Sequence, residues 1–284
     1  MGEGVSPPSR PTSDRAHEAG AGHRSDLSMM SWREVEAALL ERPAVLIPVG
    51  TSEAQGTHNP LAADYLLAHA FAQRVAEASG SVYLTGVPYG NSVAFRGFPG
   101  VVWLRPSTLE NVVLDVCRSL AYHGFDHLIV VNNHGPNEPA IETALRTLRD
   151  ESGLLVPVLW PSALARRWND EVFPPGTVGH GAEPMTSLLR HLVADGLPPL
   201  QPEPGAYHEW QGLAPESSTR AGFEGSSIGL YLDVSEYSET AARTLPSADP
   251  ELGRQLMERL VAYGVRFVSH FREMEMGLGK RSGG

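Results

Sequence analysis

Three segments of the sequence, residues 48–64, 130–138 and 179–187, contain more carboxylate, imidazole and amide side chains than packing requires. Carboxylates and neutral imidazoles bind divalent metals, and two carboxylates with one histidine leave a coordination position open for water. That composition is typical of a catalytic rather than a structural metal site. The side chains in question are Glu53, Gln55, His58 and Asp64 in the first segment, Asn132, Asn133, His134 and Asn137 in the second, and His180 and Glu183 in the third.

Several of these residues have an ordinary structural alternative when each segment is taken alone. Glu53 and Asp64 can be solvated carboxylates of a loop and a helix start, and Asn137 is expected to cap a helix or hold an Asx turn. His134 is different, because it follows an apolar strand and has no room to be an ordinary surface residue. The metal hypothesis therefore requires the three segments to meet in one place.

The elements around these segments supply such a place. Apolar runs at residues 44–50, 81–87, 127–131 and 154–159 are typical of strands covered on both faces. Helical spacing of apolar residues predicts helices over residues 31–42, 61–78, 107–123, 137–151, 185–195 and 250–272. This alternation predicts an α/β fold, a single-domain three-layer α/β/α sandwich with a mainly parallel sheet. The carboxyl ends of such strands line a ligand crevice, and the first two segments directly follow strands.

Further local signals refine the element boundaries. Capping boxes, Ser31 with Glu34 and Ser107 with Glu110, are expected to open two of the helices. The periodicity weakens beyond residue 160. There the sequence predicts a long Pro/Gly-rich region and one more strand at residues 228–234.

Composition narrows the class of protein. The chain has 284 residues, 42% hydrophobic and 19% charged, with a formal net charge of −11, which predicts a folded chain with a sizeable core. The acidic balance argues against nucleic acid and anionic membranes as partners and favours small neutral or cationic substrates. No apolar run suits a membrane span and no signal-peptide core precedes the fold, so a cytoplasmic location is expected. We expect residues 1–30 to be a disordered leader, 31–275 the folded domain and 276–284 a flexible tail.

Other nucleophiles and loops are weaker candidates. Cys117 lies in mid-helix among apolar neighbours, which indicates a buried, inert thiol, and a lone cysteine forms no internal disulfide. Ser52 lacks the Gly-x-Ser-x-Gly elbow of serine hydrolases. The glycine-rich stretches 86–90 and 96–100 lack the helix start of a phosphate loop, so backbone turns near a pocket are expected there.

The three segments, in this order, resemble the motifs of the creatininase (creatinine amidohydrolase) family. The first family motif is roughly Pro-x-Gly-Ser-x-Glu-Gln-His-Gly-x-His-x-Pro-Leu-x-x-Asp, and residues 48–64 are Pro-Val-Gly-Thr-Ser-Glu-Ala-Gln-Gly-Thr-His-Asn-Pro-Leu-Ala-Ala-Asp. Asn-Gly-His-Gly-Gly-Asn is matched by Asn-Asn-His-Gly-Pro-Asn at 132–137, and His-Ala-Gly-Glu-x-Glu-Thr-Ser by His-Gly-Ala-Glu-Pro-Met-Thr-Ser at 180–187. Tyr89 with Gly90 also resembles family positions, and the similarity covers about residues 31–275.

The resemblance implies a metal-dependent hydrolase of amide or cyclic-amide C–N bonds, with a creatininase-like fold and assembly as a homo-oligomer. By position, Glu53, Asp64 and His134 match the ligands of one divalent ion, which would be Zn²⁺, Mn²⁺ or Fe²⁺. Asp64 also matches the carboxylate that bridges to a second ion. Glu183 matches a glutamate that serves this second ion in many relatives.

Three departures from the family pattern concern that second ion. Gln55 replaces a histidine ligand, Pro136 stands where creatininase has a carboxylate, and Met185 stands where the third motif has a glutamate. They predict an intact first metal site and a weakened or empty second one. A single ion still lowers the pKa of bound water toward ~7, and Glu183 or His180 then acts as general base or acid. The remaining candidates, Gln55, His58, Asn137 and Tyr89, are expected to bind substrate or support the ligands.

Three functions stay open at this point. The first is an amidohydrolase acting on a small molecule, for which specialised metabolism is one setting. The second is a peptidase-like member that trims a small peptide precursor. The third is a degenerate homologue retained as a binding or scaffold subunit, against which the inward-facing charges argue because they are costly to bury.

Overall fold

A four-stranded parallel sheet forms the centre of the protein, whose computed structural model describes residues 24–193, 196–200, 207–242 and 248–274. The strand order is β2-β1-β3-β4, so the two central strands are β1 and β3. Both are buried along their whole length because helices cover the two faces of the sheet. The strands are β1 (Val45–Val49), β2 (Val82–Tyr83), β3 (Leu128–Asn132) and β4 (Val158–Leu159).

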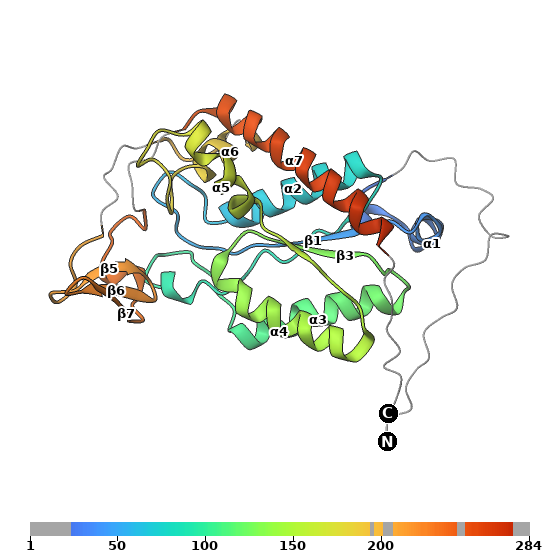
Figure 1. Ribbon diagram of the computed structural model, residues 1–284, viewed down its shortest axis with the longest axis horizontal. Coiled ribbons are helices and arrows are strands. Elements are labelled where there is room, and N and C mark those ends of the chain that lie inside the picture. The colour runs from blue at the N-terminus through green and yellow to red at the C-terminus, as the bar shows by residue number, and fades with distance from the viewer. Residues whose placement is uncertain (1–23, 194–195, 201–206, 243–247, 275–284) are drawn as a thin grey trace, which may run out of the picture.

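Helices lie on both faces of this sheet (Figure 1). One layer consists of α2 (Ala63–Ser79), α5 (Pro161–Val172), α6 (Met185–Leu192) and α7 (Pro250–Glu273). The other layer consists of α3 (Pro106–Tyr122) and α4 (Glu138–Ser152), while α1 (Trp32–Ala38) lies at one end of the sheet. The three-layer α/β/α sandwich predicted from the sequence is therefore confirmed.

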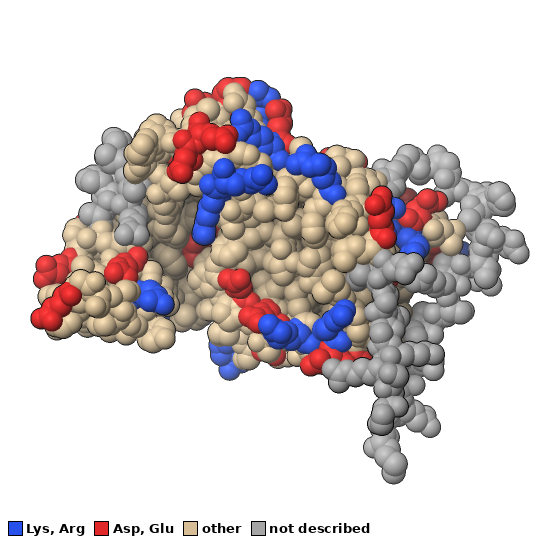
Figure 2. All heavy atoms as spheres, viewed as in Figure 1, with Lys and Arg blue, Asp and Glu red and all other residues tan. Residues whose placement is uncertain are grey.

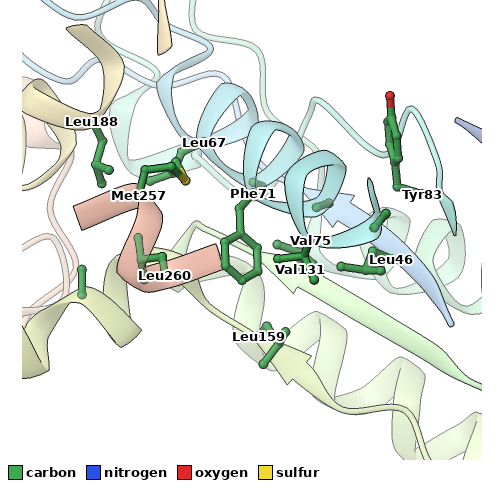
Figure 3. Close-up of a cluster of buried hydrophobic side chains, with 14 of the residues drawn as sticks. Leu46, Leu67, Phe71, Val75, Tyr83, Val131, Leu159, Leu188, Met257 and Leu260 are labelled. Atoms are coloured by element: carbon green, nitrogen blue, oxygen red, sulfur yellow. The ribbon is translucent and has the colours of Figure 1, made fainter. Parts of the chain in front are cut away.

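Apolar side chains fill the space between the layers. Figure 3 shows Phe71 and Val75 of α2 meeting Leu260 of α7 over Val131 of β3. A second apolar cluster lies under α3 and α4 and includes Cys117, which is fully buried. Burial raises the pKa of this thiol to about 12, in keeping with the inert role expected from the sequence.

A small antiparallel sheet at the end of the molecule differs from the prediction of one more strand at residues 228–234. It consists of β5 (Ala214–Ser217), β6 (Arg220–Phe223) and β7 (Ser226–Gly229), in that order (Figure 1). The turn between β6 and β7 has positive φ at Glu224 and Gly225, 46° and 78°, the geometry of a tight hairpin turn. The chain therefore pairs with its own preceding strand, and Val234 belongs to a 3₁₀ turn.

Of the two capping boxes predicted from the sequence, the structure contains one. The capping box at Ser31 is confirmed, because its backbone N–H donates to the Glu34 carboxylate at 2.7 Å and its hydroxyl accepts from the Glu34 N–H. The box predicted at Ser107 is wrong. Helix α3 already begins at Pro106, whose fixed φ suits the first helical position, and no side chain caps it. Helix α5 was not predicted at all; it also opens on a proline.

The boundary of the expected leader also lies earlier than residue 31. The Tyr83 N–H donates to the Ser25 carbonyl at 2.8 Å, and Leu27–Met29 forms a 3₁₀ turn. Residues 24–30 thus extend the edge of the sheet beside β2, while residues 1–23 and the tail from 275 lie outside the described residues. Among the helices of the described part, none has both the length and the apolar character needed to cross a bilayer.

Candidate metal centre

Three ligand-type side chains converge at the carboxyl ends of the two central strands. Glu53 lies in the loop after β1, Asp64 in the first turn of α2, and His134 directly after β3. Since β1 and β3 pair up to Val49 and Asn132, the segments that follow them leave the sheet side by side. All three side chains are buried, and one ligand atom from each lies within 4.8 Å of the others.

The imidazole of His134 points its Nδ1 atom at both carboxylates. Nδ1 lies 3.2 Å from Glu53 Oε2 and 3.3 Å from Asp64 Oδ2. The other ring nitrogen, Nε2, lies 2.9 Å from the carbonyl oxygen of Asn91, which can only accept a hydrogen bond. This contact holds the tautomer that leaves Nδ1 available as a ligand, as is usual for metal-binding histidines.

Asn137 supports that contact from behind. Its Oδ1 accepts from the Asn91 N–H at 2.8 Å, and its Nδ2 donates to the Gly50 carbonyl at 3.0 Å. Asn137 therefore acts on His134 through Asn91. The helix cap expected for it is wrong, because its side chain makes no capping bond to α4.

Burial and mutual charge perturb the pKa values of the three groups. Burial by itself lowers the pKa of His134, but the charges of Glu53 and Asp64 outweigh it and raise that pKa to about 10. Burial and then the charge of Glu53 raise the pKa of Asp64. Burial opposes ionisation of Glu53 as well, yet the neighbouring His134 holds the pKa of Glu53 below its usual value. The two carboxylates therefore stabilise a positive charge between them and His134, which is a proton on the imidazole when no metal is bound.

A divalent ion fits this donor set. Within the described residues, Glu53 Oε2 is buried and has no hydrogen-bond partner of good geometry; it lies 3.2 Å from Nδ1, where a divalent ion would take the place of the imidazole proton. One nitrogen and two carboxylate groups suit Zn²⁺, Mn²⁺ or Fe²⁺. A cation between them satisfies atoms that the protein alone leaves without a partner.

Gln55 contacts both carboxylates as well, at the Glu53 oxygen that faces away from His134 and at the Asp64 oxygen that His134 also approaches. Its Nε2 donates to Glu53 Oε1 at 3.1 Å and to Asp64 Oδ2 at 2.9 Å. Asp64 Oδ1 accepts from Asn133 Nδ2 at 3.1 Å. Amide N–H groups therefore donate to Glu53 Oε1 and to both oxygens of Asp64. Pro136 and Met185 line the same cavity and offer no ligand atom.

The third segment brings His180 and Glu183 to this cavity, outside the three-residue cluster. His180 stacks on Phe95 with ring centroids 5.0 Å apart, and its Nε2 lies 3.0 Å from the Ala54 carbonyl. Its Nδ1 lies 3.9 Å from Glu53 Oε1. The two oxygens of Glu183 accept from the hydroxyl and the N–H of Ser187 at 2.7 and 3.1 Å, at the start of α6.

The cavity itself has a volume of about 560 Å³ and is walled by the three segments, α5 and the antiparallel sheet. Figure 2 shows the surface recess between the end that carries β5–β7 and the body of the protein. Six predicted site residues line the cavity: Glu53, Gln55, Asp64, His134, His180 and Glu183.

His58, Tyr89 and Asn137, which were expected to bind substrate or support the ligands, do not line the cavity. His58 is buried behind it, where a Cβ atom on Gly56 would come within 2.4 Å of its ring, and burial lowers the pKa of His58. Tyr89 is 46% exposed on the surface. Sequence reasoning missed Asn91, and no side-chain signal marks it, because Asn91 acts on His134 through its backbone carbonyl.

Fold and site together define an α/β protein of the metal-dependent hydrolase type, with the ligands at the strand ends. The family model for creatininase, described as creatinine amidohydrolase, matches residues 28–268. The chain belongs to the creatininase family.

Individual relatives differ in what they act on. A creatinine amidohydrolase of Pseudomonas putida is 33% identical over an alignment of 184 residues, and the match covers 58% of this chain and 71% of that protein. A mycofactocin precursor peptide peptidase of Mycolicibacterium smegmatis is 34% identical over an alignment of 161 residues, and the match covers 54% of this chain and 59% of that protein. A crystal structure of creatininase superposes with a TM-score of 0.71 at 26% identity, covering 88% of this chain and 99% of that one. Other creatininase structures are described as Mn and as Zn-Zn forms.

Proposed function

We propose that this protein hydrolyses an amide C–N bond with a single divalent ion held by Glu53, Asp64 and His134. The observation that carries the proposal is the convergence of these three buried groups within 4.8 Å of one another. Hydrolysis adds one water across the bond, so that the acyl carbon takes the hydroxyl and the nitrogen takes the proton. When bound, the ion polarises the carbonyl and lowers the pKa of a water molecule at its open position.

The protein's own groups supply orientation and proton transfer. His134 is fixed by the Asn91 carbonyl, so its Nδ1 keeps one direction. His180 is the better general base, because its Nε2 faces a carbonyl and leaves the Nδ1 lone pair on the side of Glu53. The Glu183 carboxylate already accepts two hydrogen bonds from Ser187, which makes it a weaker base. His180 would take the proton from water and deliver it to the leaving nitrogen.

The count of one ion rests on Gln55. Its amide donates to both carboxylates, where a histidine ligand and a second ion would stand in the family pattern. An uncharged amide with its N–H groups turned inward mimics part of a cation's electrostatic effect on the carboxylates. The second site is thereby filled by the protein itself.

The substrate class has two candidates, a small-molecule amide and a short peptide. The relatives include a creatinine amidohydrolase and a precursor peptide peptidase, which frame the same choice. A cavity of about 560 Å³ lies in the range that holds drug-sized ligands, and this favours a substrate of dipeptide size over a single small ring. Peptide trimming is therefore the second candidate function.

The proposal also includes homo-oligomeric assembly and a cytoplasmic location, both from the sequence analysis. A scaffold role is the weaker hypothesis, since Glu53 and Asp64 are each at least 97% buried and charged groups are costly to bury without a purpose. Light scattering of the purified protein measures the assembly state directly.

The test is metal analysis coupled to a hydrolysis screen. Purified protein is analysed for Zn, Mn and Fe, then assayed for amine release from creatinine, lactams, cyclic ureas and short peptides. We expect about one equivalent of metal per chain and activity that is lost with a chelator. A Glu142→Gln variant, which changes an exposed carboxylate on α4, is the control for Glu53→Gln. Two tightly held equivalents would contradict the one-ion proposal, and hydrolysis unaffected by Glu53→Gln would contradict the metal mechanism.

A further inference from the structure

The wall of the cavity formed by α5 carries an unusual charge for this acidic protein. Arg166 lines the cavity and its side chain is exposed to it. The carboxylates on the other walls, those of Glu53, Asp64, Glu183 and Glu216, would attract a cation. Arg166 would therefore favour binding only of a ligand that carries a negative group at one end.

Arg166 has no carboxylate partner among the described residues. The arginine ion pairs of that part of the chain involve other guanidinium groups, such as Arg118 with Glu151 and Arg254 with Glu251. Glu216, on the facing wall, accepts instead from the hydroxyl of Ser227 at 2.6 Å. The guanidinium is thus available to a ligand.

Trp160 positions this arginine next to the metal-binding loop. The Arg166 guanidinium carbon lies 5.9 Å from the centre of the Trp160 ring, and the ring's Nε1 donates to Ser162 Oγ at 2.8 Å. The ring also lies against Gly135, where an added Cβ would come within 3.2 Å of it. Gly135 directly follows the ligand His134, so Trp160 contacts the metal-binding loop and lies close to Arg166.

Asn169 adds a second polar group to the same wall. It follows Arg166 by three residues on α5, lines the cavity and is only 6% exposed. Its Oδ1 accepts no hydrogen bond within the described residues. Because that oxygen is shielded from solvent, the exposed Arg166 guanidinium is the group of this wall that a ligand can reach, and it suits an anion.

We propose that Arg166 is a specificity-determining residue that binds a carboxylate on the amine side of the amide, so that the substrates are N-acyl amino acids or the C-terminal ends of short peptides. This inference rests on the proposed amide hydrolysis and adds the substrate class. The carboxylate of such a compound is separated from the amide nitrogen by a single carbon. Its capture by Arg166 would direct the scissile C–N bond toward the ligands beside Gly135. It differs from the expectation of neutral or cationic substrates, which was drawn from the net charge of the whole chain.

A pair of probes that differ only in this carboxylate tests the inference. N-benzoylglycine and its carboxamide are titrated calorimetrically into full-length protein, once after chelator treatment and once after loading with Mn²⁺. In both states we expect N-benzoylglycine to bind about tenfold more tightly, the effect of one charge-assisted hydrogen-bonded pair. The measurement in metal-free protein separates Arg166 from direct binding of the carboxylate to the ion.

Two matched variants complete the design. Arg166→Gln should reduce the tenfold preference to about onefold. Arg167→Gln should keep it, because Arg167 packs over Trp168 at 4.8 Å and does not line the cavity. Thermal melts that match the wild type confirm that both variants fold.

Several outcomes would overturn the inference: equal binding of the two probes, no binding of either, a preference found only in Mn²⁺-loaded protein, or a preference that survives in Arg166→Gln. Release of glycine from N-benzoylglycine is followed separately. A preference for the carboxylate without any hydrolysis would contradict the proposed function and support the binding role of Arg166. Hydrolysis without the preference would support the proposed function and contradict the binding role of Arg166.

Discussion

The two sides of the Glu53–Asp64 carboxylate pair differ in what faces them. On one side the Nδ1 atom of His134 faces the carboxylates, and the Asn91 carbonyl holds the other ring nitrogen. On the other side Gln55 presents N–H groups to the same two carboxylates. The imidazole is a ligand-type group, whereas the amide is a hydrogen-bond donor toward the carboxylates, so in the proposed function a cation binds on the first side and not on the second. In that proposal Gln55 is the residue that distinguishes a one-ion centre from a two-ion centre.

The largest expected effect comes from removing a ligand on the His134 side. Glu53→Gln or His134→Ala should lower the bound metal from about one equivalent to near zero, because two remaining ligands rarely hold a divalent ion tightly. Elemental analysis after dialysis measures this. Glu142→Gln should retain the full equivalent, and metal that stays bound in Glu53→Gln would show that the ligands lie elsewhere.

The pH dependence of metal binding tests the same side. The pKa of His134 is raised to about 10 in the absence of metal, above the ordinary ~6.5 of an unfolded chain. Protonation of His134 therefore contributes stability that is fully present below about pH 6.5 and is lost as the pH rises toward 10. Because an ion must displace this proton, Mn²⁺ affinity should rise about tenfold per pH unit from about 6.5 to 8.5. Competition with a chromogenic chelator measures it, and a flat profile would contradict the assigned proton.

The Gln55 side is tested by restoring a ligand. Gln55→His replaces two N–H donors with an imidazole and should raise the metal content from about one to about two equivalents at millimolar Mn²⁺. Pro136→Glu added to it should tighten the second ion further, since it supplies a carboxylate at the family's position. Gln55→Leu is the control for losing the amide alone. A Gln55→His protein that still binds a single ion would mean that Pro136 or Met185, not Gln55, excludes the second.

The smallest expected effect concerns the support beneath His134. A methyl group at Gly90 would lie 2.4 Å from Asn137 Oδ1 and 2.5 Å from the Gly50 carbonyl oxygen. Gly90→Ala should therefore lower the free energy of unfolding by about 1–3 kcal/mol, as overpacked positions do. Gly229→Ala, where an added Cβ meets nothing within 4 Å, should change it by less than about 0.5 kcal/mol. Chemical denaturation measures both, and equal values would mean that the Gly90 contact can relax.

Much of the fold was readable from local patterns, and the failures have local causes. Buried strands such as β1 and amphipathic helices such as α4 leave a clear period in the sequence, so the sandwich could be predicted. Helix α5 was missed although Leu164, Trp168 and Val172 recur every four residues and pack on the core. The antiparallel sheet was missed because its strands are short and rich in glycine and serine, with the closing turn at Gly225 as the main signal.

The candidate site divides in the same way. The side chains of Glu53, Asp64 and His134 could be selected by type and by their positions after strands. Arg166 could not be selected from the sequence, because nothing in the spacing of residues along α5 indicates that Arg166 lies on the side of the helix that faces the cavity.

By itself the sequence determined which ligand atoms exist and the order of elements that carries them, because residue type fixes chemistry and spacing fixes secondary structure. It also determined that Gln55, Pro136 and Met185 depart from the family pattern. Only the tertiary structure decided that the Gln55 amide turns its hydrogens to both carboxylates, that a backbone carbonyl fixes His134, and that Arg166 faces the cavity. These are distances between segments far apart in the chain, and they are set by how the sheet and its covering helices pack rather than by any local pattern.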